Sequence, residues 1–370
     1  MKIIHFSDTH LWLWLENTTR EEDFYKNFEQ VINDILLEKP DYVIHSGDLF
    51  HTSKPSNKAI SVVISNFLKL SESGIKVIII AWNHDTPRLS TTTHSFEIFK
   101  TFKWFYTFYE PEIKKLEFEG VNFVMLPHIH DENIFKDEFK KAPDFLEKDK
   151  INVFVSHFWI SYKEYEEYTD EISWVNISVE ELEILKKFDY VALGHYHKNF
   201  SLPWTNISYS GSLEHTSFNQ KNYKVWYNIL NFSDKLDKEI KYLQTRKMID
   251  LLDFDCENIL ETEVLILELE SKIDKSLIKD AIVKINFVNM NLKLLLDFRE
   301  NLIYNFFKET FYFEYKKIKK QDENVKNNID IKNSLNIIND NFKDFLANYP
   351  DIEKKDEIEK EISELLKAID

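Results

Sequence analysis

Four short groups of potential metal ligands follow one another along the chain, and each comes directly after an apolar, β-prone segment. The groups are Asp8-Thr9-His10, Gly47-Asp48, Asn83-His84 and Gly194-His195-Tyr196-His197, with a single His157 between the third and the fourth. The apolar segments are residues 2–6, 42–45, 77–81, 153–155 and 190–193. Residues that follow the strands of an α/β sheet lie on loops at the sheet edge, where such folds place their sites. We therefore expect an α/β fold that brings these side chains together.

The residue types in these groups indicate the kind of metal. The candidate ligands are Asp8, His10, Asp48, Asn83, His157, His195 and His197. Carboxylates, imidazoles and one amide oxygen suit Mn²⁺, Fe²⁺ or Zn²⁺ better than Ca²⁺, which prefers oxygen ligands alone. These ligands are too many for one ion, whereas two ions that share a bridging carboxylate would use them all. Paired ions about 3.5–4 Å apart stabilise the attacking and leaving oxygens of a phosphoryl displacement. The sequence therefore predicts phosphoester hydrolysis.

The order D-x-H, G-D, N-H-D, H and G-H-x-H resembles that of the calcineurin-like metallophosphoesterase superfamily. Further details resemble its SbcD-type DNA repair nucleases: His51 three residues after Asp48, the segment NHD-T-P, and the segment YSGSLE from Tyr209 to Glu214. The resemblance covers about the first two thirds of the chain. One D-x-H or one isolated histidine is more often a structural feature than a ligand, so the prediction depends on the combination.

The resemblance also implies roles for single residues. One ion would be bound by Asp8, His10, Asp48 and His197, and the other by Asp48, Asn83, His157 and His195, with Asp48 bridging. His84 would stabilise the transition state or protonate the leaving oxygen, and His51 would approach the same phosphate. The remaining histidines considered, which have no ligand partner in the pattern, are interpreted as structural: His5, His45, His94, His128, His130 and His215.

The tryptophans depart from the family pattern. The family has glycine before the Asn of its G-N-H motif, where the chain turns sharply, but this chain has Trp82. Trp12 lies where the family commonly reads H-L-G. Other tryptophans in loop- or turn-like segments are Trp14, Trp159, Trp174 and Trp204, whereas Trp104 and Trp226 are less diagnostic.

Composition points the same way, because the chain has 8 Trp and only 5 Gly, whereas average usage of about 7% would give about 26 glycines. Our hypothesis is that many or all of these tryptophans are glycines, encoded by UGA codons that were read as tryptophan. The alternative is that they are real and pack a protein with 30 Phe and 17 Tyr. A real Trp82 would strain the metal loop and would favour a non-catalytic scaffold.

The composition is typical of a cytoplasmic enzyme with more than one domain. A chain of 370 residues with 43% apolar content can bury a large core. The single Cys256 excludes an internal disulfide, which suits a reducing cytoplasm. We find neither an apolar run long enough for a membrane helix nor a signal peptide, and expect no membrane association. The net charge of −17 repels DNA at long range, so DNA binding would need basic patches, the metals or a partner.

The apolar pattern predicts a nuclease domain over residues 1–246 with two face-to-face sheets flanked by helices. The expected strands are residues 2–6, 42–45, 75–80, 121–126, 153–155, 190–193, 207–209, 223–230 and 239–243, and the expected helices are 21–37 and 57–73. This count fits the four-layer αββα sandwich of the superfamily. Residues 247–322 are expected to form a small α/β capping domain, with strands at 264–269 and 282–288 and helices at 275–281 and 292–307.

Residues 323–370 are predicted to form C-terminal helices. Apolar residues recur there at spacings of three and four, at Ile331, Leu335, Ile338, Phe342 and Phe345. This stripe would either pack on its own domain or dock on the coiled coil of an SbcC-type, SMC-like ATPase. We found no glycine-rich phosphate loop, so any ATP use would belong to that partner.

These observations favour a DNA exonuclease and endonuclease of the SbcD type with two divalent ions, Mn²⁺ first and Fe²⁺ or Zn²⁺ as alternatives. It would act in double-strand-break repair, as a homodimer with the ATPase. Two other functions stay open. One is a phosphodiesterase or phosphatase for small nucleotides, against which the capping domain argues, and the other is the non-catalytic scaffold.

Overall fold

The computed structural model describes residues 1–370 except 16–17, 90–91, 161–174, 204 and 320–370. The chain forms two compact units. The first comprises residues 1–250, 275–283 and 307–313, and the second comprises residues 251–274, 284–306 and the described part of 314–370.

The first sheet of the first unit has six strands in the order β16-β15-β1-β4-β5-β6. Their bounds are β1 Lys2–Phe6, β4 Tyr42–Ser46, β5 Lys76–Ile80, β6 Phe105–Phe108, β15 Trp226–Phe232 and β16 Leu236–Tyr242. Strands β1, β4, β5 and β6 run parallel, and β15 and β16 join them antiparallel. Because Phe6 pairs with His45 and Ser46 with Ile80, the carboxyl ends of β1, β4 and β5 meet at one edge.

The second sheet also has six strands, in the order β13-β14-β12-β9-β8-β7. Their bounds are β7 Lys114–Phe118, β8 Val121–Met125, β9 Ile151–His157, β12 Tyr190–Gly194, β13 Phe200–Ser201 and β14 Ile207–Tyr209. Strands β8, β9, β12 and β14 are parallel, with Gly194 paired to His157. This register brings His157 next to His195.

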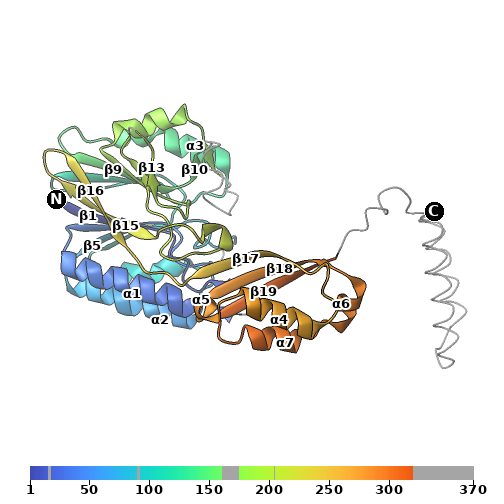
Figure 1. Cartoon of the computed structure of the whole chain (residues 1–370). Helices are drawn as coiled ribbons and strands as arrows, with labels where there is room; N and C mark the ends of the chain where they lie inside the picture. The colour runs from blue at the N-terminus through green and yellow to red at the C-terminus, as the bar shows by residue number, and fades with distance from the viewer. Residues whose placement is uncertain (16–17, 90–91, 161–174, 204, 320–370) are drawn as a thin grey trace, which may run out of the picture. The chain divides into compact units, whose positions relative to one another are not determined.

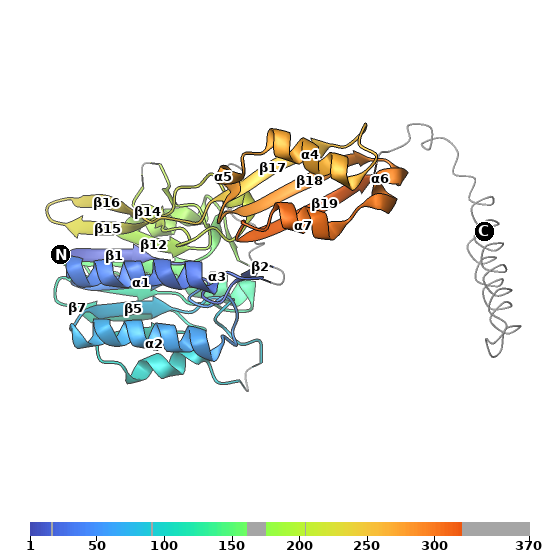
Figure 2. The same ribbon diagram turned by 60° about the horizontal axis from the view of Figure 1, so that its bottom comes forward.

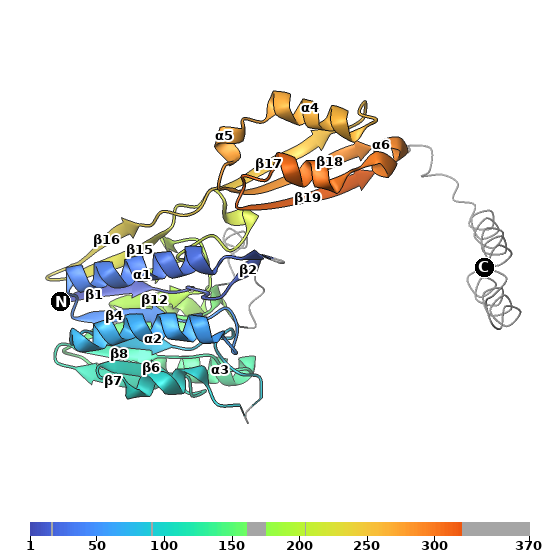
Figure 3. The ribbon, with the colours of Figure 1, turned by 90° about the horizontal axis from the view of Figure 1, so that it is seen from below.

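Three apolar cores hold the two sheets and their helices together. One lies between the sheets and includes Ile44 of β4 and Val155 of β9. A second packs helices α1 (Glu21–Glu38) and α2 (Asn57–Glu72) on the outer face of the first sheet (Figures 1 and 3). The third packs α3 (Glu132–Lys140) on the outer face of the second sheet. The predicted αββα sandwich is confirmed.

Local sequence explains where the long helices begin and end. Helix α1 has three acidic residues in its first turn, which the helix dipole stabilises, and it stops at Lys39 in a left-handed conformation with φ 47°. Helix α2 begins after Ser56, whose side chain accepts a hydrogen bond from the Ala59 N–H. Both helices bury one apolar stripe against the sheet.

Shorter elements complete the first unit. The short strands are β2 Trp14–Leu15, β3 Thr18–Thr19, β10 Trp159–Ile160 and β11 Asn176–Ile177, and the 3₁₀ helices are Ser95–Thr101, Ala142–Phe145, Glu181–Lys187 and Phe218–Gln220. Helix α5 spans Lys275–Ile278. In the part of the chain that the structure describes, no helix has the length and apolar character that a membrane span requires.

The C-terminal part of the described chain contains a three-stranded sheet in the order β17-β18-β19, accompanied by helices α4, α6 and α7 (Figure 2). The bounds are β17 Met248–Asp255, β18 Ile282–Met290, β19 Tyr312–Lys319, α4 Thr262–Lys272, α6 Leu292–Asp297 and α7 Glu300–Phe306. Strands β17 and β19 were not predicted, and the predicted helix at 292–307 is two helices separated near Phe298.

The prediction of a strand at residues 264–269 is wrong, because these residues lie in α4. Leu265 and Leu269, four residues apart, are buried, whereas Val264 and Leu267 are 43% and 64% exposed, which is a helical pattern. The helix start is fixed from elsewhere in the chain, since Asp297 accepts hydrogen bonds from the Thr262 N–H (2.6 Å) and hydroxyl (2.7 Å). The boundaries 1–246, 247–322 and 323–370 stay predictions, and the last segment lies outside the described residues.

Candidate metal centre

The loops after β1 and β4 continue the pairing of their strands and present the first ligands. The Asp8 N–H donates to the Gly47 carbonyl (3.0 Å) and the His10 N–H to the Asp48 carbonyl (3.1 Å). Asp8, His10 and Asp48 have φ values of 49°, 39° and 55°, and His195 has 99°. Non-glycine residues with positive φ are uncommon, and such backbone strain concentrates at functional sites.

Two glycines allow the ligand loops to approach each other closely. A Cβ on Gly47 would lie 2.5 Å from His157 Nδ1, and Gly47 itself has φ 99°. A Cβ on Gly194 would lie 2.5 Å from the same Nδ1 and 2.7 Å from the Ser46 carbonyl oxygen. Any larger side chain at either position would displace His157.

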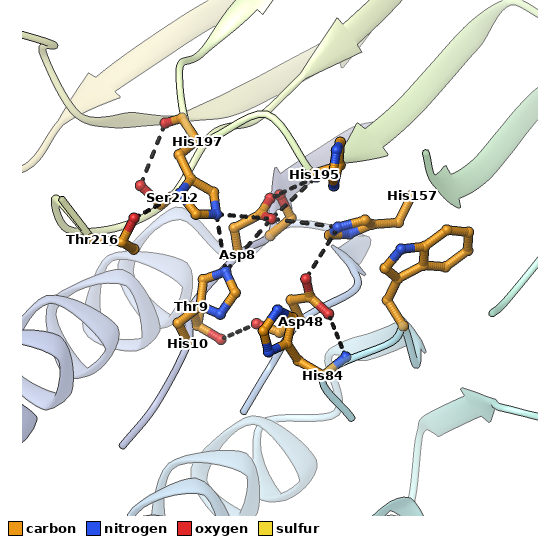
Figure 4. A network of polar contacts seen from close by, with 12 residues as sticks. Asp8, Thr9, His10, Asp48, His84, His157, His195, His197, Ser212 and Thr216 are labelled. Atoms are coloured by element: carbon orange, nitrogen blue, oxygen red, sulfur yellow. Dashed lines mark hydrogen bonds and ion pairs between the residues drawn. The ribbon is translucent and has the colours of Figure 1, made fainter. Parts of the chain in front are cut away.

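Asp8, His10 and His197 form the first group of converging ligand atoms (Figure 4). Their side chains are buried, and His10 Nε2 lies 3.1 Å from His197 Nε2. The Asp8 Oδ1 lies 4.0 Å and 3.9 Å from these two nitrogens. Two imidazole nitrogens and a carboxylate oxygen that point at one another fit a shared divalent cation.

Asp8, Asp48 and His157 form the second group. His157 Nε2 lies 3.2 Å from Asp48 Oδ2 and 3.6 Å from Asp8 Oδ1. The His157 Nδ1–H donates to the Ser46 carbonyl (2.8 Å), which leaves the Nε2 lone pair for a metal. The Asp8 carboxylate therefore belongs to both groups, and the bridging role of Asp48 stays a prediction.

His195 and Asn83 lie close to these groups without joining them among the described residues. The His195 backbone N–H donates to both Asp8 carboxylate oxygens (3.1 and 3.2 Å), and its ring is 5.6 Å from the His157 ring. Asn83 is half-buried in the loop after β5. Their assignment as ligands stays a prediction.

His10, His51 and His84 form the third group, which contains both predicted catalytic histidines. The His84 ring stacks on His51 (5.3 Å between centroids) and lies edge-on to His10 (5.0 Å). The His84 Nδ1–H donates to the His51 carbonyl (2.8 Å), so Nε2 is the nitrogen available for proton exchange. A cavity of about 190 Å³ lies beside this group and is lined by His10, Leu13, Trp14, His51, His197, Thr216 and Ser217.

Asp85 joins two ligand loops, a role that the sequence did not reveal. Its buried carboxylate accepts hydrogen bonds from the N–H groups of Leu49 (3.2 Å), Phe50 (2.9 Å) and Trp82 (3.2 Å). Burial and, secondly, the nearby Asp48 raise the pKa of Asp85 to about 8, although the three N–H donors lower it. A bound cation would oppose the effect of Asp48.

The structure separates the tryptophans that sequence reasoning grouped together. Trp82 is buried and stacks on the His157 ring (5.1 Å between centroids). Among the described residues with positive φ, Trp82 is absent, so the expected backbone strain at this position is wrong. Trp12 and Trp104 do have left-handed backbones, with φ 78° and 67°. Backbone geometry therefore favours glycine at positions 12 and 104, whereas Trp174 and Trp204 lie outside the described residues.

Comparison with known proteins agrees with this geometry. A family model described as calcineurin-like phosphoesterase matches residues 1–199. The chain is 26% identical over 347 residues to the SbcD component of the nuclease SbcCD of Staphylococcus epidermidis, and the match covers 87% of this chain and 90% of that protein. It is 33% identical over 202 residues to "DNA double-strand break repair protein Mre11" of Sulfurisphaera tokodaii, covering 53% of this chain and 49% of that relative.

Solved structures were also compared. A dimetal phosphatase from Danio rerio is 10% identical with a TM-score of 0.38, and the match covers 65% of this chain and 95% of that one.

Proposed function

This chain belongs to the calcineurin-like phosphoesterase family, as its motif order predicts, and on that premise we propose that it is a DNA exonuclease and endonuclease of the SbcD type. The observation that carries the proposal is the convergence of Asp8, Asp48 and three histidines from two different sheets. The similarity to a component of the SbcCD nuclease over most of both chains supports DNA as the substrate.

The proposed centre contains two divalent ions, Mn²⁺ first and Fe²⁺ or Zn²⁺ as alternatives. Asp8, His10, Asp48 and His197 would bind one ion, and Asp48, Asn83, His157 and His195 the other. The donor set fits such ions, because buried imidazole nitrogens and carboxylate oxygens face one another. When bound, the ions would supply an activated water and stabilise charge on the phosphate.

His84 and His51 are the proposed catalytic residues of the chain itself. Because His84 Nδ1 is held by the His51 carbonyl, the His84 ring has a fixed orientation. Its Nε2–H would donate a proton or a hydrogen bond to the leaving oxygen of the phosphodiester, and His51 would approach the same phosphate.

Removing His84 tests this mechanism. His84→Ala should keep two bound metal ions and DNA affinity but lose most of the cleavage rate, whereas Asp48→Asn should lose metal. Metal content measured by atomic emission, together with cleavage of linear duplex DNA in Mn²⁺, checks both expectations. Loss of metal in His84→Ala would mean that His84 is a ligand and not a proton donor.

A small-nucleotide phosphodiesterase is the second candidate, and the net charge of −17 favours it because it repels a polyanion. Duplex DNA and a small aryl phosphodiester, assayed side by side with Mn²⁺, distinguish the two. DNA cleavage supports the nuclease, and hydrolysis of the small ester alone supports the phosphodiesterase. A protein that binds metal but cleaves neither substrate would be a scaffold.

We also propose that the protein acts in double-strand-break repair in the cytoplasm, as a homodimer with an SbcC-type, SMC-like ATPase. Residues 247–322 would control DNA access as a capping domain, and residues 323–370 would dock on the ATPase. The name of the Staphylococcus epidermidis relative, which marks it as one part of a two-component nuclease, supports a partner. Co-purification with and without residues 323–370 tests the docking, since a partner retained equally by both forms would contradict it.

A further inference from the structure

The segment from Tyr209 to Glu214 ends in a buried carboxylate with several donors. Glu214 is 1% exposed, and Oε1 lies 3.3 Å from an Arg20 nitrogen and accepts the His215 N–H (2.8 Å). Its Oε2 accepts from the Asn27 amide (3.2 Å) and the Arg246 N–H (3.4 Å). A buried charge with this many partners is a fixed point of the fold.

Arg20 is the main partner of Glu214, and its side chain is fully buried. Its guanidinium binds Asp23 (3.2 Å) as well as Glu214, and it donates to the His215 carbonyl. Asp23 in turn is held by Arg246 through three contacts of 2.8–3.0 Å. Removing one member of such a network leaves another charge buried without compensation, which is strongly unfavourable.

The residues on either side of Glu214 hold His197. The Ser212 N–H donates to the His197 carbonyl (3.1 Å), which fixes the backbone. The Thr216 hydroxyl oxygen lies 2.8 Å from His197 Nδ1, and the Gln220 amide nitrogen lies 2.9 Å from it. Gln220 is positioned by the Thr216 N–H, which donates to its Oε1 (2.9 Å). Figure 4 shows Ser212 and Thr216 on the side of His197 away from His157.

We propose that Glu214 is a positioning residue for His197: its pairing with Arg20 anchors residues 212–220, which orient the imidazole toward His10 and Asp8. The inference rests on the proposed function, in which His197 binds a metal. With His197 Nε2 directed at the ion, Nδ1–H donates to Thr216, and the ring orientation then depends on the anchored loop. Partners of this kind typically change metal affinity by about 10- to 100-fold.

Glu214→Gln tests the proposal because it removes the charge but keeps the size of the side chain. We expect Mn²⁺ titration calorimetry to show a loss of about 10- to 100-fold at one site and little change at the other. Thr216→Val should weaken the same site, and the double variant should be no worse than the stronger single variant, because both act through His197. Glu147→Gln, which removes a surface pair with Lys115 (2.6 Å), is the matched control and should bind both ions as the wild type does.

A second readout separates positioning from general destabilisation. In the Zn²⁺-loaded wild type, ¹⁵N spectra of the imidazoles should show His197 protonated at Nδ1 alone, and Glu214→Gln should broaden or shift that signal without affecting His157. If Glu214→Gln does not fold, Glu214→Asp keeps the charge with a shorter reach and should show the same selective loss at smaller size.

Two outcomes overturn the proposal in distinguishable ways. A folded Glu214→Gln that binds both ions with wild-type affinity and keeps the His197 signal excludes the positioning role alone. A wild-type protein that binds no divalent ion overturns the proposed function, and the positioning role with it. Selective loss of one site supports the proposal even if the substrate proves to be a small nucleotide.

Discussion

Position 104 offers a direct measurement of whether the chain needs glycine there. Trp104 has φ 67°, and its ring is 45% exposed, with the Lys76 ammonium 6.0 Å from the ring centroid. Trp104→Ala and Trp104→Gly remove the same ring contacts, so the difference between the two variants isolates the backbone.

The expected difference follows from conformational energies. A left-handed conformation costs a residue with a Cβ about 1–2 kcal/mol, whereas glycine adopts it freely. Glycine loses more conformational entropy on folding than alanine, about 0.5–1 kcal/mol in an ordinary position. Trp104→Gly should therefore be more stable than Trp104→Ala by up to about 1 kcal/mol.

Trp226 is the matched control, because it lies within β15, pairs with Tyr242 across the strands and has no left-handed backbone. There the order should be reversed, with Trp226→Ala more stable than Trp226→Gly by about 0.5–1 kcal/mol. Urea unfolding of the four variants, followed by circular dichroism, gives both differences. If alanine equals or exceeds glycine at position 104, the backbone is not left-handed there, and the argument for glycine fails. Mass spectrometry of position 104 in protein from the native organism then identifies the residue itself.

Two further substitutions test the structure around the site. Asp85→Asn replaces one acceptor oxygen with an amide that faces backbone N–H groups, so the unfolding free energy should fall by about 2–4 kcal/mol in urea titrations; unchanged stability would show that the carboxylate does not hold the two loops. Burial lowers the pKa of Lys238 from 10.5 to about 8. The unfolded chain therefore binds more protons between these pH values, wild-type stability should rise with pH across them, and Lys238→Met should lack that rise; an equal rise in both proteins would contradict the assignment.

Local patterns were sufficient to predict the sandwich and the gathering of most site residues. Strands such as Val43 to His45 are marked by short apolar runs, and ligands that follow parallel strands meet at one edge whatever the rest of the chain does. The run from Val264 to Leu269 fits a strand or a helix equally well, and Asp297, which is distant in sequence, caps it as a helix. The assignments of Asn83 and His195 as ligands stay predictions.

The contacts that orient the site residues depend on tertiary packing and have no local signal. The Ser46 carbonyl that accepts from His157 lies 111 residues away in sequence, and Thr216 and Gln220 carry no recognisable motif. Trp82 shows the opposite failure, because a residue that seemed incompatible with its turn instead packs on His157.

The distribution of the candidate ligands over two sheets has a consequence for how the protein is made. Asp8, His10 and Asp48 belong to segments that leave the ribosome early, but His10 meets His197 across 187 residues of sequence. Domains form only when the segments that pair within them have been synthesised. A nascent chain therefore cannot assemble the centre until β12 has emerged and joined β9, so the growing polypeptide stays without phosphoester-cleaving activity during the first half of its synthesis.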